Sequence, residues 1–344
     1  MSWLIVNVED KHRWDDIVKS FASYDVYYLN GYVRAFQKHG DGEPKLLYYN
    51  TDSLRAIYVF MQRSTSIEGV YDSITPYGYG GVLFEGKTTP ANLQEFWSEY
   101  VFKMRENHIV DNFVRYHPVL ANADFMRQIT DVIDLGKTIA MDLSSPEIIW
   151  ENIVSKNRNM IRKAEKSGIE IFHSKDATLF DEFIRIYNAT MDRDNAIEYY
   201  YFKEDFYKSI YTDLADNYEM FYATLDGKII AMSIILFANK QMHYHLSGSL
   251  VEYRNLAPSN LLLYKAALWG CEQGYKTFHL GGGVGSGEDN LYKFKAAFNR
   301  NSNYQFSIAK QIFDQSLYDQ LVADRAKKDL SFNVESTFFP LYRA

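Results

Sequence analysis

The stretch MHYHLSGSLVEYRNLAPSNLLLYKAALWGCEQGYKTFHLGGGVGSGEDNLYKFKAAF, residues 242–298, predicts the fold of the second half of the chain. Its opening residues favour a strand, which Ser247-Gly248-Ser249 is expected to end. Pro258 then begins a helix that is apolar on most of its circumference, so burial is expected. Lys276–Leu280 is predicted as a strand that enters Gly281-Gly282-Gly283, where a ligand or other backbone can approach closely because no Cβ intervenes.

A strand, a loop at a helix N-terminus, a helix and a neighbouring strand can together hold an acyl donor or a phosphate. The same order also describes an ordinary βαβ packing unit. The pattern by itself therefore predicts an α/β fold and leaves both interpretations open.

Composition sets limits on the class of protein. With 344 residues, 47% of them hydrophobic, the chain can bury substantial cores, and its length favours two domains. A formal net charge of −7 argues against binding nucleic acid over a broad surface, and no DNA partner is expected, while local basic patches are compatible with this charge. The single Cys271 excludes an internal disulfide and is expected to be a buried structural thiol.

No targeting segment is expected from the sequence. The first residues, MSWLIVNVEDKHRWDD, lack the basic region and the long apolar run of a signal peptide. No segment approaches the roughly 20 apolar residues that a membrane-spanning helix needs. We therefore expect no integral membrane segment and a cytoplasmic location.

Several motifs resemble the FemABX-like branch of the GNAT acyltransferase superfamily. They are SG at 247–248, APSNLL at 257–262, GY at 274–275, GGG at 281–283, LYKFKAAF at 291–298, DSITPYGYGGVL at 72–83, FVRYHP at 113–118, NRNMIRKAEKSG at 157–168 and FPLYR at 339–343. The resemblance implies an α/β (α+β) fold of two tandem GNAT-like domains, each a mixed, mostly antiparallel sheet flanked by helices.

An internal repeat agrees with two domains. Thr89-Pro90-Ala91-Asn92-Leu93 opens a long helix in the first half much as Ala257-Pro258-Ser259-Asn260-Leu261 does in the second. We expect a first domain over residues 1–145 and a second over 146–324, which carries the acyl-transfer site. The resemblance suggests that residues 325–344 pack back on the first domain.

The predicted helix Ser155–Lys166 is strongly basic, with Lys156, Arg158, Arg162, Lys163 and Lys166. Arg158 and Arg162 are four residues apart, so they share a face and are able to bind a phosphate. A solvated helix face explains the same charges, and the two interpretations stay open.

Common catalytic devices are not found in the sequence. The eight histidines show no zinc-ligand spacing, so no metal site is expected. Neither a G-x-S-x-G nucleophile turn nor a phosphate-binding P-loop occurs. Direct acyl transfer needs neither device, because the protein only has to position an amine against an activated ester or thioester, stabilise the oxyanion and relay a proton.

Lys295 is the first candidate for that electrostatic role. Leu291, Phe294 and Phe298 are expected to mark the buried face of its helix, with Lys295 at the edge of that face. In the family, the Lys of a Phe-Lys-x-x-Phe sequence lies beside the transferred acyl group, and Phe294 to Phe298 match this sequence. Lys293 is a competing candidate, and a surface lysine with its stem packed along the helix is the structural alternative.

The donor loop departs from the superfamily pattern. Coenzyme-A-dependent members carry R/Q-x-x-G-x-G/A, whereas Arg254–Ser259 has Ala257 and Ser259 at the glycine positions and Pro258 between them. The resemblance therefore favours aminoacyl-tRNA over acyl-coenzyme A as co-substrate, and no tightly bound cofactor is expected. The expected donor-binding residues are Ser247, Gly248, Arg254, Ser259, Asn260 and Tyr292.

Three functions remain open from the sequence. The first is transfer of an aminoacyl group from tRNA, bound by its acceptor end, to a peptidoglycan precursor. The second is acyl-coenzyme-A-dependent N-acylation of an amino sugar or another small amine, and the third is a non-catalytic binding protein. The expected acceptor-binding residues, which the resemblance places near a cleft between the domains, are Tyr77, Tyr79, Arg115, His117, Arg193 and Tyr200.

Overall fold

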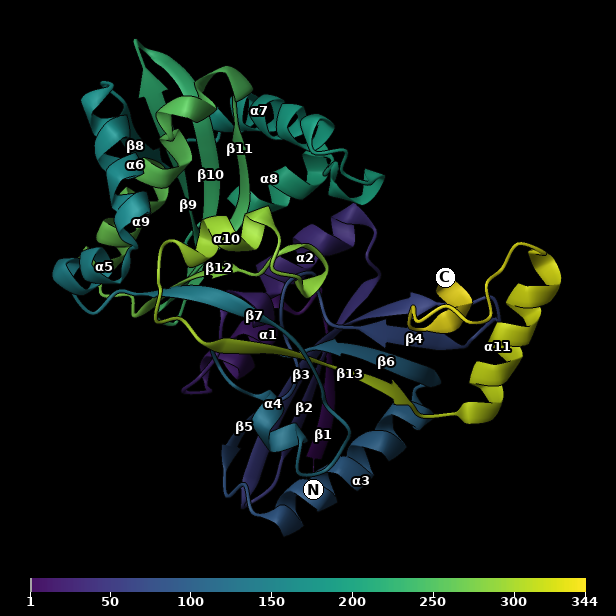
Figure 1. Cartoon of the computed structure of the whole chain (residues 1–344). Coiled ribbons are helices and arrows are strands. Elements are labelled where there is room, and N and C mark those ends of the chain that lie inside the picture. Colours follow the sequence, from purple (N-terminus) through teal and green to yellow (C-terminus); the bar gives the residue numbers. More distant parts are fainter. Residues whose placement is uncertain (1) are drawn as a thin grey trace. The chain divides into compact units, whose positions relative to one another are not determined.

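The computed structural model describes residues 2–344 and divides into two compact units, which are considered separately (Figure 1). Unit 1 comprises Met1–Leu135 and Gln305–Ala344, and unit 2 comprises Gly136–Tyr304. The boundaries between the units follow residues 135 and 304, so both come earlier in the chain than the expected boundaries after residues 145 and 324. Residues 139–142 pair with a strand of unit 2, and residues 308–312 pair with a strand of unit 1, so backbone hydrogen bonding moves each boundary.

Unit 1 is built around a mixed, mostly antiparallel sheet of order β1-β2-β3-β4-β6-β13, with β5 paired to β3. Its strands are β1 (Ser2–Asn7), β2 (Glu43–Asn50), β3 (Leu54–Ser64), β4 (Tyr71–Ile74), β5 (Leu83–Gly86), β6 (Ile109–Arg115) and β13 (Tyr304–Ile312). Its helices are α1 (Lys11–Lys19), η1 (Val26–Tyr28), α2 (Asn30–His39), α3 (Pro90–Glu106), α4 (Ala123–Met126), α11 (Gln315–Lys328) and η5 (Leu341–Arg343).

Unit 2 has a sheet of order β7-β12-β11-β10-β9-β8. Its strands are β7 (Ile133–Asp142), β8 (Glu170–Ser174), β9 (Tyr218–Leu225), β10 (Lys228–Ala238), β11 (Gln241–Ser249) and β12 (Thr277–Gly281). Its helices are α5 (Pro146–Asn152), α6 (Ser155–Lys166), α7 (Leu179–Arg193), η2 (Glu198–Tyr200), α8 (Glu204–Asp213), η3 (Val251–Leu256), α9 (Pro258–Glu272), η4 (Val284–Ser286) and α10 (Asn290–Ala296). Figure 1 shows α7 and α8 on one side of this sheet and α5, α6 and α9 on the other.

The two sheets follow the same plan, as the predicted fold class requires. Each contains one parallel pair among antiparallel ones, β4 with β6 in unit 1 and β11 with β12 in unit 2. A helix with proline in its first turn, α3 or α9, precedes the second strand of each pair. A parallel pair needs such a crossover connection, which explains why the prolines of the two sequence repeats recur at these points.

Each unit has its own apolar core. In unit 1, Phe96 and Tyr100 of α3 pack against Tyr49 and Tyr58 of the sheet. In unit 2, the buried side of α9, including Leu261 and Leu262, packs in one core with sheet residues such as Phe278. The burial of α9 agrees with its apolar circumference in the sequence.

Strand β11 is longer than the sequence predicted. It runs through Ser249 rather than ending at Ser247-Gly248-Ser249. A Cβ at Gly248 would lie 2.8 Å from the Ile186 carbonyl oxygen and 2.9 Å from the Tyr187 Cα of α7. The glycine therefore lets a helix approach the strand closely, and it does not end the strand.

The C-terminal segment is held on unit 1. Tyr318 of α11 stacks on Phe339, and its hydroxyl oxygen accepts the amide of Leu341 at 2.9 Å. Arg343 donates to the Ser64 carbonyl oxygen at 2.8 Å and to the Asp72 carboxylate. Among the described helices, none is both long and apolar enough to cross a membrane.

Candidate active site

A fork between two parallel strands marks the candidate site in unit 2. Strands β11 and β12 pair only over Gln241–His243 and Thr277–His279. Beyond that point β11 continues beside β10, while Gly281 of β12 pairs with Ile139 of β7. The two inner strand edges therefore no longer bond to each other, and backbone groups at such edges are suited to hydrogen-bond an extended ligand.

Three histidines lie at this fork. His243 and His279 are opposite each other in the last paired position, are both buried, and have ring centroids 5.7 Å apart. The register between β10 and β11 shifts next to His245, which is the additional residue of a β-bulge. Burial, and then the charge of His243, lowers the pKa of His245 to about 3, so its ring is neutral at physiological pH.

Lys295 of α10 is a buried cation beside the end of β12. Its side chain is only 9% exposed, and Nζ donates a hydrogen bond to the carbonyl oxygen of Gly282 at 2.7 Å. Within residues 2–344 this is the one hydrogen-bond partner of Nζ that the structure describes, whereas an ammonium group has three donors. Lys295 therefore retains donors for a ligand.

Electrostatics set the protonation of Lys295. Burial lowers its pKa from the ordinary value to about 8, while the charge of Asp289 opposes this shift. The ammonium form still predominates at pH 7. A buried cation with donors to spare is the kind of group that stabilises developing negative charge, since its field is little screened there.

The loop before α10 is shaped by Asp289. Its carboxylate caps α10 by accepting the Tyr292 amide at 2.8 Å, and it also accepts the Val284 amide at 3.2 Å. These backbone hydrogen bonds, that from Tyr292 first, lower the pKa of Asp289. A Cβ at Gly283 would lie 2.1 Å from the Gly287 carbonyl oxygen, so glycine is required for the loop to fold against itself.

This folded loop changes which face of α10 is buried. The sequence periodicity placed Leu291 on the buried face and Lys295 at its edge, but Leu291 is 40% exposed and Lys295 is buried. The reason is that Lys295 reaches the loop after β12 through Gly282. Phe294 and Phe298 pack on the unit 2 core as expected, with ring centroids 5.4 Å apart, and Lys293 is exposed.

Ser247 and Gly248, two of the expected donor-binding residues, make internal contacts. The Ser233 hydroxyl of β10 donates to the Ser247 hydroxyl oxygen at 2.9 Å, and Gly248 packs on the backbone of α7. Both contribute to the sheet and helix packing beside the fork.

The other expected donor-binding residues lie in η3, in the first turn of α9 and on α10. Asn260 donates to Oδ1 of Asn157 at 2.7 Å, and Asn157 donates to the Ala297 carbonyl oxygen at 3.2 Å, which connects α9, α6 and the end of α10. Arg254 is exposed in η3, and Ser259 lies in the first turn of α9. Tyr292 lies on α10 and packs against the unit 2 core.

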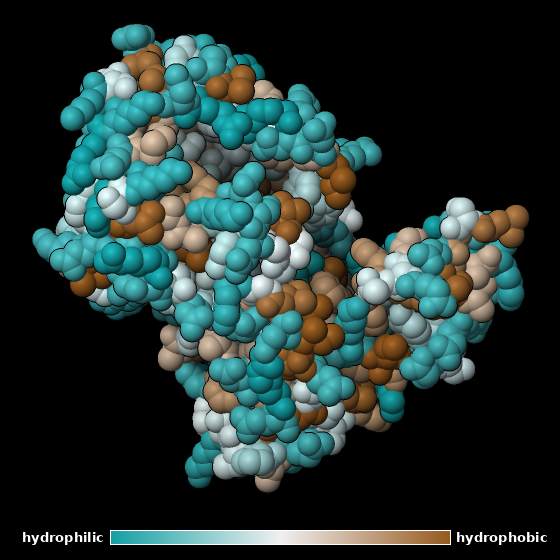
Figure 2. Space-filling model, viewed as in Figure 1, coloured by the Kyte–Doolittle hydropathy of each residue, from teal (hydrophilic) through white to brown (hydrophobic). Residues whose placement is uncertain are grey.

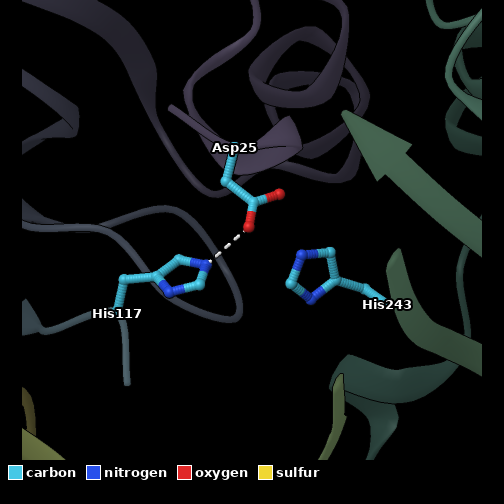
Figure 3. Close-up of side chains that lie close together, drawn as sticks. All are labelled: Asp25, His117 and His243. Carbon is cyan, nitrogen blue, oxygen red and sulfur yellow. Dashed lines mark hydrogen bonds and ion pairs between the residues drawn. The ribbon is translucent and has the colours of Figure 1, made fainter. Parts of the chain in front are cut away.

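In unit 1, His117 is fully buried and bonded to a residue that the sequence did not suggest. Nε2 of His117 lies 2.8 Å from Oδ2 of Asp25, which is also fully buried, and Figure 3 shows the carboxylate facing the ring. Nδ1 accepts the Leu120 amide at 3.1 Å, so Nε2 carries the proton and donates it to Asp25.

The Tyr-Gly loop of unit 1 packs around this pair. The Tyr79 ring contacts the rings of Tyr27 and His117, with centroids 5.8 and 5.9 Å away, and burial raises its pKa. Tyr77 stacks on Phe36. Arg115 donates to the Thr75 carbonyl oxygen at 3.2 Å, which braces the chain just before the loop.

The expected acceptor residues of unit 2 lie at the end of α7 and in η2, which follows it. Arg193 donates to the Ser249 carbonyl oxygen at 3.1 Å and pairs with Asp194 at 2.9 Å, so it closes the end of β11. Tyr200 is partly exposed in η2, where its ring contacts Tyr199 edge to face.

Sequence reasoning missed three features of these sites. Asp25 is 92 residues from His117, and no local pattern connects them. The Gly282 carbonyl oxygen is a backbone group that only the fold brings to Lys295. Asp289 had a signal, because an Asp directly before a helix, three residues ahead of the amide that it caps, is a common N-cap.

Comparison with known proteins is consistent with this geometry. Residues 154–296 match the acetyltransferase (GNAT) domain family, and they contain the fork and Lys295. Over 176 residues the chain is 25% identical to the UDP-N-acetylmuramoylpentapeptide-lysine N(6)-alanyltransferase of Weissella viridescens. That match covers 49% of this chain and about half, 50%, of the alanyltransferase.

Solved structures show the same fold. The crystal structure of FemX superposes with a TM-score of 0.68 at 14% identity, over 93% of this chain and 99% of that one. The C-terminal domain of a putative lysylphosphatidylglycerol synthetase from Agrobacterium fabrum gives 0.57 at 15% identity, over 93% and 96% of the two chains. The domain match and the similarity to the alanyltransferase support an acyltransferase. The chain therefore contains a GNAT acetyltransferase domain and is similar, in sequence and in fold, to the FemABX-like branch of that superfamily.

Proposed function

We propose that this chain transfers an aminoacyl group from aminoacyl-tRNA to an amine of a peptidoglycan precursor. The activity of the Weissella viridescens relative, a pentapeptide-lysine alanyltransferase, supports the acceptor class. The general activity, acyl transfer to an amino group, is supported by the match of residues 154–296 to the GNAT domain family.

The buried ammonium group of Lys295 is the observation that carries the proposal. It lies beside the end of β12, one donor is used by Gly282, and its remaining donors have no described partner within residues 2–344. Burying a cation that has no carboxylate bonded to it costs folding free energy. Such a cation is explained if it binds a negatively charged group during the reaction. An acyl-transfer oxyanion is such a group.

The chemistry requires little else from the protein. The acceptor amine attacks the carbonyl carbon of the donor ester, which forms a C–N bond and places negative charge on the carbonyl oxygen. Lys295 stabilises that oxyanion, the C–O bond to the donor breaks, and the proton lost by the amine ends on the leaving oxygen. Positioning both substrates and stabilising the oxyanion supply most of the rate increase.

The turn before α9 favours the tRNA donor over coenzyme A. Pro258 removes one amide from the turn, and Ala257 takes the left-handed conformation, with φ of 60°. Acyl-coenzyme A stays the second candidate donor, because the family that matches residues 154–296 is described as acetyltransferase. For the acceptor we propose Tyr77 and Tyr79 of unit 1 and Tyr200 of unit 2, three residues of intermediate exposure.

The test compares donors and variants in one assay. Purified full-length chain is incubated with UDP-N-acetylmuramoyl-pentapeptide and either radiolabelled alanyl-tRNA or radiolabelled acetyl-coenzyme A, and products are identified by mass. We expect label transfer from alanyl-tRNA and a loss of rate of about 10²–10³-fold in Lys295→Ala. The exposed neighbour Lys293→Ala is the matched control and should keep its rate.

Other outcomes would change the proposal. Transfer from acetyl-coenzyme A alone would replace the donor and direct the acceptor search to amino sugars. A folded Lys295→Ala variant with the wild-type rate would remove Lys295 from the mechanism. Absence of transfer from both donors, with pentapeptide still bound, would favour a non-catalytic binding protein.

A further inference from the structure

A basic hollow lies on α6 of unit 2, outside the fork. It has a volume of about 390 Å³ and is lined by Asn159, Arg162, Lys163, Lys166 and Ser167. Three of these residues are cations and none is acidic, on a chain whose net charge is −7. Hydrophilic residues cover this side of unit 2 in Figure 2. The hollow is therefore a local concentration of positive charge.

The structure divides the basic residues of α6 into two roles. Arg158 donates to the carbonyl oxygens of Trp150 and Ile153, at 3.3 and 3.0 Å, and so caps the end of α5. Arg162 instead places its guanidinium over the Trp150 ring, 5.1 Å from the centroid. One of the two interpretations of the sequence placed Arg158 and Arg162 together on a phosphate-binding face, and the other was a solvated helix face. In the structure Arg162 faces the hollow with Lys163 and Lys166, and Arg158 has a structural role.

The hollow adjoins the turn that enters α9. Nζ of Lys163 donates to the Asn255 carbonyl oxygen at 2.5 Å, and α6 packs along α9. Lys163 therefore joins the cations of α6 to the end of η3, directly before the first turn of α9.

That turn has few amides to offer an anion. Helix N-termini usually bind phosphates through the N–H groups of their first turn. Here Pro258 has no N–H, and the amides of Asn260 and Leu261 both donate to the Ala257 carbonyl oxygen, at 3.2 and 3.4 Å. The Ala257 amide donates to the Arg254 carbonyl oxygen at 3.1 Å. The Ser259 amide and the cationic side chains of α6 are the donors that remain close to this turn.

We propose that the α6 hollow binds phosphate groups of the acyl donor, with Arg162, Lys163 and Lys166 in place of the amides at the start of α9. The proposal rests on the acyl-transfer function proposed above. Arg162 can bind a phosphate through two parallel N–H groups, and the lysines add mobile point charges. The same chemistry suits the phosphodiesters of an RNA donor and the diphosphate of coenzyme A.

The test measures binding without turnover. Full-length chain is titrated with uncharged tRNA, with coenzyme A and with inorganic pyrophosphate at several salt concentrations. The variant R162Q/K163Q/K166Q is compared with K203Q/K208Q/K276Q, which removes three exposed lysines elsewhere on unit 2 and so matches its charge. The single variants R162Q and K166Q keep the Lys163 bond to Asn255 and control for disturbance of the η3 turn.

For an RNA donor we expect the hollow variant to bind tRNA at least about tenfold more weakly, with a reduced slope of log K against log salt, because each phosphate contact contributes about 0.7–0.9 to that slope. The matched control should change by less than about twofold. Weaker binding of coenzyme A and pyrophosphate, with tRNA binding unchanged, would identify the diphosphate as the occupant.

Two results would overturn the proposal. One is wild-type affinity of the hollow variant for all three probes, and the other is failure of the wild-type chain to bind any of them. The transfer assay on the wild-type chain separates the two proposals. A wild-type chain that binds donor through the hollow but transfers no acyl group would refute the proposed function and leave the proposal for the hollow intact.

Discussion

The hydroxyl oxygen of Tyr342 lies 2.7 Å from Oδ2 of Asp111 and 2.9 Å from Oδ2 of Asp72, and neither carboxyl has any exposed surface. A phenol has a single proton, so it can donate to only one of these oxygens. Asp72 also accepts hydrogen bonds from Arg63 and Arg343, which stabilise its charge. Asp111 accepts the Tyr342 hydroxyl and, among the described residues, has no arginine hydrogen-bonded to it, so it is the carboxyl that takes up a proton more readily.

We predict that unit 1 loses stability as the pH rises through neutrality. Burial raises the pKa of Asp111 to about 7, against an ordinary value of 3.8. Between these pH values the folded state holds a proton that the unfolded state has lost. The contribution is therefore complete below about pH 4 and is lost as the pH rises through 7, by up to about 1.4 kcal/mol per pH unit.

Urea unfolding from pH 4.5 to 8 checks this prediction. Asp111→Asn should flatten the decline, because an amide does not titrate, while Asp131→Asn, an exposed position in the same unit, should leave it unchanged. An identical pH dependence in the wild type and in Asp111→Asn would show that Asp111 is not the responsible group.

The rate should depend on the protonation of Lys295. Its pKa is lowered to about 8, so the cation is lost as the pH rises through 8. We expect the wild-type rate to fall relative to that of Lys295→Arg between pH 7 and 9, since a guanidinium stays charged. Expressing the rates as a ratio cancels the titration of the acceptor amine. A ratio that stays constant over this range would argue against an ionic role for Lys295.

Gly283→Ala should damage the site more than an equivalent change nearby. The added methyl would lie 2.1 Å from the Gly287 carbonyl oxygen and 2.4 Å from Oδ1 of Asp289. The loop must move to relieve this, which we expect to cost about 1–3 kcal/mol and to lower the transfer rate at least about tenfold. Gly287→Ala is the control, because its nearest atom would be 3.5 Å away. Equal melting temperatures and rates for the two variants would contradict the argument.

The Asp25–His117 pair should contribute to stability. Asp25→Ala leaves the His117 Nε2–H and the Val26 amide without the carboxylate that accepts both. We expect a loss of about 1–3 kcal/mol in the free energy of unfolding, measured with urea. Asp25→Asn keeps an acceptor oxygen and should lose less. If His117 binds acceptor directly, His117→Gln would raise KM without changing stability, which is opposite to our expectation.

Local patterns predicted much of this fold. The start of α3 was expected from Thr89-Pro90, because capping chemistry depends on neighbouring residues, and the turn Asn50-Thr51-Asp52-Ser53 between β2 and β3 has residues typical of a hairpin. The helical periodicity of α10 placed Phe294 and Phe298 correctly. It misplaced Leu291 and Lys295, since the loop of residues 281–287 folds against α10 and periodicity contains no information on such a loop.

The sequence by itself predicted the two α/β units and their shared order of strands and helices, because these depend on residue type and short spacing, and the family resemblance made Lys295 the candidate for stabilising the oxyanion. Tertiary structure decided the burial of Lys295 against Gly282, the bond between Asp25 and His117, and the hydrogen bond from Tyr342 to the buried Asp111. Each of these joins groups through chain folding, and the energy of a buried polar group depends on the partner that folding brings to it. The sequence identifies Lys295 as a candidate, but its pKa is lowered only because folding buries its side chain.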